Sequence, residues 1–233
     1  MLWYKGWLET RFRLLLSFGA VACFLITLHS LTHGAAKLPV AALNAITGVP
    51  KISVIWICGM LAGAGITTQP AIQASKGLHG STLFTLSLPV SRLRLLAIRA
   101  SIGWLESAAT ISMFCYGIWL LIPGARAAVT GVQMIEFAGT LIASATLLYF
   151  VSVLLATFLD DQWRVWGTML VPLVFWQLTS HITLPAFADI LRAIGNGSPL
   201  ITHTMPWPTV AFSLTVAVIF FLAALKVVQT REY

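Results

Sequence analysis

Apolar residues along the chain fall into six runs, each close to the length of a helix that crosses a membrane. A helix needs about 20 apolar residues to cross the ~30 Å hydrocarbon core of a bilayer. The runs lie at 14–31, 52–68, 102–122, 137–159, 165–182 and 210–228. This pattern predicts an all-α membrane protein with six transmembrane helices, built as a single domain over residues 1–233.

Composition supports lipid rather than water as the solvent of most side chains. Hydrophobic residues make up 58% of the chain and charged residues only 9%, whereas soluble domains carry about 25% charged residues. The first 13 residues hold several charges, so we expect a retained, amphipathic helix at the membrane surface rather than a cleaved signal peptide. The net charge of +7 is spread over segments that flank the apolar runs, and no nucleic-acid partner is expected.

The positions of lysine and arginine predict the orientation of the chain. Cytoplasmic loops of membrane proteins carry an excess of these residues. With both termini in the cytoplasm, ten of the 14 lie inside: Lys5, Arg11, Arg13, Lys76, Arg92, Arg94, Arg99, Arg164, Lys226 and Arg231. Only Lys37, Lys51, Arg126 and Arg192 then lie outside. The bias predicts that both termini are cytoplasmic.

Glycine spacing in the second run indicates close helix packing. Gly59 and Gly63 are four residues apart in GMLAGAG, which gives a flat strip where a neighbouring helix can approach. Packing within the chain is the simpler interpretation, and a sliding or dimer-forming surface is the functional one.

Glu106 is the one acidic residue well inside a predicted span. A charge in the bilayer is costly and often marks function. It is expected to serve as a structural anchor or as a contact at an inner gate, with a proton relay as the alternative. His29 and His33 share a helical face but lack the further ligands that a metal site needs, so no metal is expected. Asp160 and Asp161 are expected to cap a helix in a solvated turn.

Residues 69–99 form the longest predicted cytoplasmic connection. Leu83 and Leu86 lie on a partial apolar face of a short helix, which Pro89 ends because the residue before a proline avoids helical geometry. Ser91 can cap the next helix, whose Arg92, Arg94 and Arg99 then meet the inner headgroups. This segment is either an interfacial helix that rests on lipid or a docking element for a cytoplasmic partner.

The stretch GSTLFTLSLPVSRLRLLAIRA, residues 80–100, resembles the signature of type-2 ABC transporter permeases. The matching positions are Gly80, Leu86, Leu88, Pro89, Val90, Ser91 and Arg92. WLETRFRLLL near the amino terminus is similar to that family's interfacial entry helix, and LKVVQTREY resembles its usual carboxyl-terminal end. Family members often place an acidic residue shortly before the glycine, where this chain reads ASKGLHG with no acid.

The resemblance implies a membrane-spanning permease subunit of an ATP-driven exporter in the bacterial inner membrane. Two such subunits, identical or related, would pair with cytoplasmic ABC ATPase subunits that bind ATP and magnesium. The implied ATPase-coupling residues are Gly80, Leu83, Phe84, Leu86, Leu88, Pro89, Ser91 and Arg92. Consistent with a separate ATPase, the chain has no G-x-x-x-x-G-K-[ST] phosphate-binding motif, and it carries no cofactor or hydrolase motif of its own.

Two other classes of protein remain as alternatives. One is an intramembrane enzyme that uses Glu106, His29 or His33, and the other is a membrane scaffold that transports nothing. The substrate of a permease cannot be read from the residues. The apolar spans and short outer loops favour a lipid-like, drug-like or peptide substrate over a bulky sugar polymer.

Overall fold

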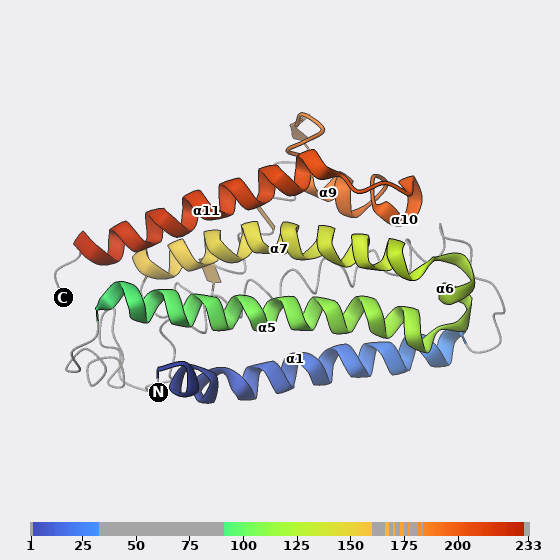
Figure 1. The fold of residues 1–233 in the computed structure, drawn as a ribbon, viewed down its shortest axis with the longest axis horizontal. Helices are drawn as coiled ribbons and strands as arrows, with labels where there is room; N and C mark the ends of the chain where they lie inside the picture. Colours follow the sequence, from blue (N-terminus) through green and yellow to red (C-terminus); the bar gives the residue numbers. More distant parts are fainter. Residues whose placement is uncertain are drawn as a thin grey trace.

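The computed structural model describes residues 2–32, 91–159 and 184–230, with a few isolated positions between 166 and 182. All the regular structure in these residues is helical (Figure 1). The helices are α1 (Leu2–Thr32), α5 (Arg92–Leu121), α6 (Pro123–Ala128), α7 (Gly131–Phe158), α9 (Ile190–Ile194), α10 (Pro199–Thr202) and α11 (Trp207–Thr230).

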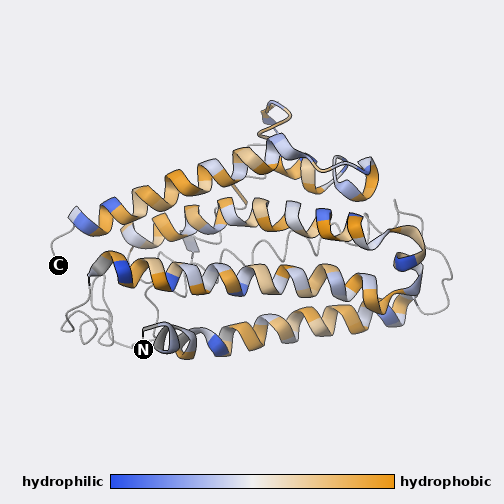
Figure 2. Ribbon diagram, in the orientation of Figure 1, coloured by the Kyte–Doolittle hydropathy of each residue, from blue (hydrophilic) through white to orange (hydrophobic). Residues whose placement is uncertain are grey.

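Four of the described helices are long and apolar enough to cross a membrane: α1 from Thr10 onward, α5 from Leu93 onward, α7 and α11. The apolar runs at 14–31, 102–122, 137–159 and 210–228 fall on these four helices, so the described residues confirm helices of membrane-spanning length and composition at four of the six runs. The run at 52–68 lies outside the described residues, and so does most of the run at 165–182. Figure 2 shows apolar positions along all four helices.

The two helices α1 and α5 run in the same direction. Thr10 in the third turn of α1 contacts Glu106 in α5, and His29 near the end of α1 contacts Leu121 at the end of α5. Residue numbers therefore rise together along the pair. The ends of the bundle are named here after α5, as the Ser91 end and the Leu121 end.

The helix α7 runs in the opposite direction to α5, and α11 runs in the same direction as α7. Trp104 of α5 contacts Thr146, whereas Trp119, further along α5, contacts Val129 just before α7. The aromatic rings of Phe150 and Phe221 lie 5.0 Å apart between α7 and α11. In Figure 1 the four helices lie in a row in the order α1, α5, α7, α11.

Local sequence explains where the central helices begin. Ser91 has extended backbone, and its side chain accepts the N–H of Arg94 at 3.3 Å, so it caps α5. Thr130 and Gln133 form a reciprocal capping box at the start of α7. Between α5 and α7, Pro123 occupies the first turn of α6, where its missing N–H removes no hydrogen bond.

The largest cluster of buried apolar side chains occupies the Leu121 end of the bundle. The short helices α6, α9 and α10 contribute to it and pack against the long helices there. Its members at this end include Ile122, Ala125, Val129, Met134, Ile190, Ile194 and Leu200. The short helices are therefore part of the packed core and not an external appendage.

Small residues allow the long helices to approach closely. A side chain at Gly117 of α5 would collide with Leu25 of α1. On α11, Ser213, Ala217 and Ala224 are all fully buried. In lipid the hydrophobic effect does not hold helices together, so association depends on this kind of close van der Waals packing and on hydrogen bonds.

Candidate functional site

The segment predicted to couple to an ATPase enters the described structure only at its carboxyl-terminal end. Ser91 caps α5 and Arg92 is the first residue of that helix, as the sequence predicts. Six further residues of the predicted coupling set, together with the predicted packing glycines, lie outside the described residues: Gly80, Leu83, Phe84, Leu86, Leu88, Pro89, Gly59 and Gly63.

The arginines after Ser91 occupy different surroundings. Arg94 is exposed, in keeping with a position among lipid headgroups, whereas Arg99 is only 6% exposed and faces the bundle. Five helical residues correspond to a rotation of about 140°, so two arginines at this spacing point to different sides of the helix. The sequence predicts that both arginines meet the headgroups. The exposure of Arg94 agrees with this prediction, whereas the burial of Arg99 does not.

Glu106 lies between α5 and α1, at the middle of α5 and opposite the third turn of α1. It is 4% exposed, and its Oε1 atom accepts a hydrogen bond from the hydroxyl of Thr10, which is also buried. The partners are 96 residues apart in the sequence. A carboxylate at this depth is stabilised by such contacts, and its place between two helices fits the expected structural anchor.

Hydroxyl groups beside Glu106 are satisfied within their own helix. Thr110 donates to the carbonyl oxygen of Glu106 at 2.8 Å, and Ser107 donates to that of Gly103 at 2.9 Å. The hydrogen bond from the Thr10 hydroxyl reaches the carboxylate from the other helix, α1.

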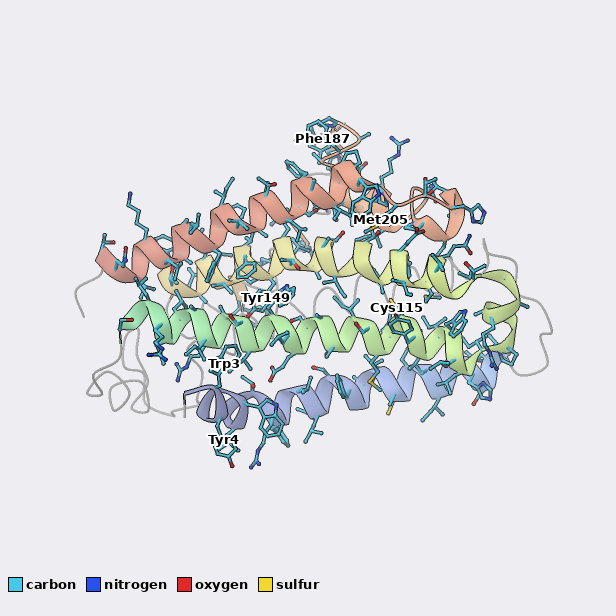
Figure 3. The ribbon with its side chains drawn as sticks, viewed as in Figure 1. Trp3, Tyr4, Cys115, Tyr149, Phe187 and Met205 are labelled. Atoms are coloured by element: carbon cyan, nitrogen blue, oxygen red, sulfur yellow. The ribbon has the colours of Figure 1, made fainter. Side chains whose placement is uncertain are left out.

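A second polar contact joins α5 to α7 nearer the Ser91 end of the bundle. The hydroxyl of Tyr149 donates to the carbonyl oxygen of Ala100 at 2.8 Å, and Tyr149 is almost fully buried. Figure 3 shows this side chain between the two helices. One turn away, the indole N–H of Trp104 donates to the hydroxyl of Thr146 at 2.9 Å. Tyrosine and tryptophan normally bury their polar atoms only where such partners exist.

His29 has a structural role at the opposite end of the bundle. Its Nδ1 atom lies 2.8 Å from the carbonyl oxygen of Leu121, the last residue of α5. A carbonyl can only accept, so Nδ1 carries the proton and donates. The last carbonyls of a helix lack partners within the helix, and His29 supplies one from α1.

The remaining polar candidates do not assemble into a catalytic or metal-binding group in the part of the chain that the structure describes. Cys115 is buried and Cys23 is exposed, and no cluster of three potential metal ligands occurs among the described residues. His33, Cys58, Asp160 and Asp161 lie outside them. The polar contacts described here join one helix to another.

The sequence pattern did not indicate Thr10, Thr146 or Tyr149 as contact residues. Threonine and serine are common in membrane helices, and most of those described here bond to their own backbone, as Thr140 and Ser144 do. The signal that would have helped is the pairing of residues across helices, which a single sequence does not contain.

Comparison with protein-family models finds no match, and comparisons with curated proteins and with solved structures find none either.

Proposed function

We propose that this chain is the membrane-spanning permease subunit of an ATP-driven transporter of the type-2 ABC class, acting as an exporter in a bacterial inner membrane. The observation that carries the proposal is the Leu-Pro-Val-Ser-Arg sequence at residues 88–92. Its serine caps a helix that continues without a break to Leu121. A push at the Ser91 end would therefore be carried along the full length of α5.

The directions of the long helices support six spans. Because α1 and α5 run in parallel, Thr32 and Arg92 lie at opposite ends of that pair (Figure 1). The apolar run at 52–68 would supply the return crossing between them. By the same reasoning, α7 and α11 run in parallel and the run at 165–182 would return the chain. Six crossings place both termini on one side, which the distribution of basic residues assigns to the cytoplasm.

The mechanism assigns one role to residues 69–99 and another to α5. Closure of a pair of ABC ATPases on ATP and magnesium would push the coupling segment, and α5 would tilt between inward-open and outward-open arrangements. A ligand shifts such an equilibrium only through contacts that differ between the two states. The coupling segment is where the ATPase would make those contacts, and a second permease subunit, identical or related, would complete the pathway.

An intramembrane enzyme is the second candidate, and the positions of its expected residues argue against it. Thr10, which contacts Glu106, and His29 are 19 residues apart on α1, or about 28 Å along the helix axis. Glu106 and His29 could not act on one reacting group at that separation.

Substitution of Leu83 tests the coupling role. The native complex would be purified with an ATPase subunit identified by its G-x-x-x-x-G-K-[ST] sequence, and ATP hydrolysis would be measured in proteoliposomes. Leu83→Asp is expected to leave membrane insertion intact and to release this ATPase, because a buried leucine contact typically contributes ~2–5 kcal/mol where packing is tight.

The matched control is Thr85→Asp, which places the same charge on the other side of the predicted helix. It is expected to retain the ATPase. Equal recovery of the ATPase with wild type and with Leu83→Asp, at unchanged rates of hydrolysis, would return this segment to the role of a helix resting on lipid.

A further inference from the structure

The α1–α5 pair is joined by different kinds of contact at two levels. At the Leu121 end, Leu25 packs over Gly117 and His29 donates to the carbonyl of Leu121. Nearer the Ser91 end, at the third turn of α1 and the middle of α5, the hydroxyl of Thr10 donates to the carboxylate of Glu106. The first is close packing plus a bond to backbone, and the second is a bond between two side chains.

The position of the side-chain bond suits it to transmit movement. Glu106 is 14 residues after Arg92, so it lies about 21 Å along α5 from the start of the helix. The residues between them belong to one continuous helix, which moves as a stiff rod over that distance. A displacement at Ser91 therefore reaches Glu106, and α1 follows only if the two helices are tied together at that level.

We propose that the Thr10–Glu106 hydrogen bond clamps α1 to α5, with Glu106 as the positioning residue, so that a push on the coupling segment moves both helices as one unit. This inference rests on the proposed function for the source of the push, but the clamp itself is a property of the chain alone. The role assigned to Glu106 is accordingly to hold α1 against α5, and not to bind substrate or nucleotide.

Thr10 offers a matched pair of substitutions. Thr10→Val keeps the shape of the side chain and removes the hydroxyl, whereas Thr10→Ser keeps the hydroxyl. A lost interhelical hydrogen bond in a membrane protein shifts the equilibrium between joined and separated helices by about threefold on average. Any effect of Thr10→Val that Thr10→Ser does not share is due to the hydrogen bonding of this hydroxyl, which also lies 3.4 Å from the carbonyl oxygen of Trp7 within α1.

The first measurement uses spin labels on exposed positions of the full chain in lipid nanodiscs, with Cys23, Cys58 and Cys115 replaced by alanine. One pair, Phe12→Cys and Leu105→Cys, reports on the level of the Thr10–Glu106 contact. The other, Leu31→Cys and Leu120→Cys, reports on the Leu121 end, and all four native side chains are exposed.

With Thr10→Val we expect a broader and longer distance distribution for the first pair and an unchanged one for the second. With Thr10→Ser both should match wild type. A first-pair distribution in Thr10→Val identical to that of wild type would overturn the clamp.

The second measurement adds ATP and magnesium to the complex with its ATPase. In wild type the first pair should keep its distance, because α1 follows α5. In Thr10→Val the same addition should separate the two labels. Equal separation in wild type and in Thr10→Val would overturn the transmitting role.

The two proposals fail in different ways. If no ATPase co-purifies with the chain, the proposed function and the transmitting role both fall. The nanodisc distances, which need no ATPase, still decide whether Thr10 clamps the helices.

Discussion

Tyr149 reaches the carbonyl of Ala100 because residue 103 has no side chain. A Cβ atom built at Gly103 would collide with the hydroxyl oxygen of Tyr149 and would lie 3.3 Å from the ring carbon that bears it. The ring is rigid and almost fully buried, so it cannot swing aside without disturbing α7. Gly103 thus allows α5 and α7 to approach closely, because the hydroxyl group of Tyr149 occupies the space that a side chain at residue 103 would need.

Gly103→Ala should therefore destabilise the bundle. Forcing one methyl group into a filled site typically costs about 1–3 kcal/mol. The measurement is the unfolding of the purified chain in mixed micelles titrated with SDS. Tyr149→Phe in the same chain should recover part of the loss, because it removes the oxygen that the new methyl group meets.

Gly19→Ala is the matched control for this substitution. A Cβ at Gly19 has no neighbour within 4 Å, so the added methyl group should leave stability unchanged or raise it slightly through its helix propensity. Equal losses for the two substitutions would show that Gly103 has no special packing role.

Single residues differ in how far the sequence predicts their roles. Ser91 was predicted to cap a helix because capping depends on neighbours three residues away, and the structure confirms it. The anchoring role of Glu106 was expected because an acid in an apolar run needs partners, but Thr10 could not be named as one of them. The two are 96 residues apart, and only the packing of whole helices brings them together.

At the scale of elements, hydrophobic length predicts six helices, and the four that lie in the described residues are confirmed, although their ends differ from the ends of the runs. The run at 102–122 marks the apolar part of α5, whereas the helix itself begins at Arg92. Similarly, α1 continues from Leu2 to Thr32, so the predicted surface helix at 1–13 and the run at 14–31 form one continuous helix. Helical hydrogen bonds do not stop at the edge of the hydrocarbon, so an apolar run gives a minimum length for its helix.

The contact between α7 and α11 depends on small buried residues. Ala217 is 0% exposed, whereas its neighbour Val218 is 56% exposed. Ala217→Leu should push the two helices apart and lower the free energy of unfolding by about 1–3 kcal/mol, because the added atoms have no space. The same SDS titration would measure it.

Val218→Leu adds bulk to the outward-facing side of the same helix and should be tolerated. If Ala217→Leu were tolerated equally well, close packing of α11 on α7 would not be what holds the pair together.

At the scale of the whole molecule, the parallel pairs α1–α5 and α7–α11 constrain the path of the chain. The sequence predicts how many apolar runs there are and the side on which basic residues gather. It does not predict that α5 lies between α1 and α7, because every run is apolar enough to pack against any other. Which helices become neighbours depends instead on the packing of individual side chains, such as that of Leu25 over Gly117.

The proposed topology predicts opposite accessibility for two exposed positions. Single cysteines at Arg94→Cys and Asn196→Cys, in the cysteine-free chain, would be labelled in intact cells with a reagent that cannot cross membranes. Asn196→Cys should react and Arg94→Cys should react only after lysis, because the proposed topology places the two positions on opposite sides of the bilayer.

Both positions are exposed in the structure, so burial would not mask a reaction at either of them. Labelling of Arg94→Cys in intact cells, together with protection of Asn196→Cys, would reverse the orientation.

The contact between Thr10 and Glu106 also bears on how the protein is made. Of the four membrane-length helices, α5 has the least apolar sequence, and it carries an acidic side chain into the bundle. Insertion scales assign a penalty of roughly 2.5–3.5 kcal/mol to a charged side chain at the middle of a helix. Synthesis proceeds from the amino terminus, so α1 and its hydroxyl leave the ribosome before α5 does. The order of synthesis thus makes α1, with the hydroxyl of Thr10, available to Glu106 when α5 is inserted, a partner that α5 would lack as an isolated segment.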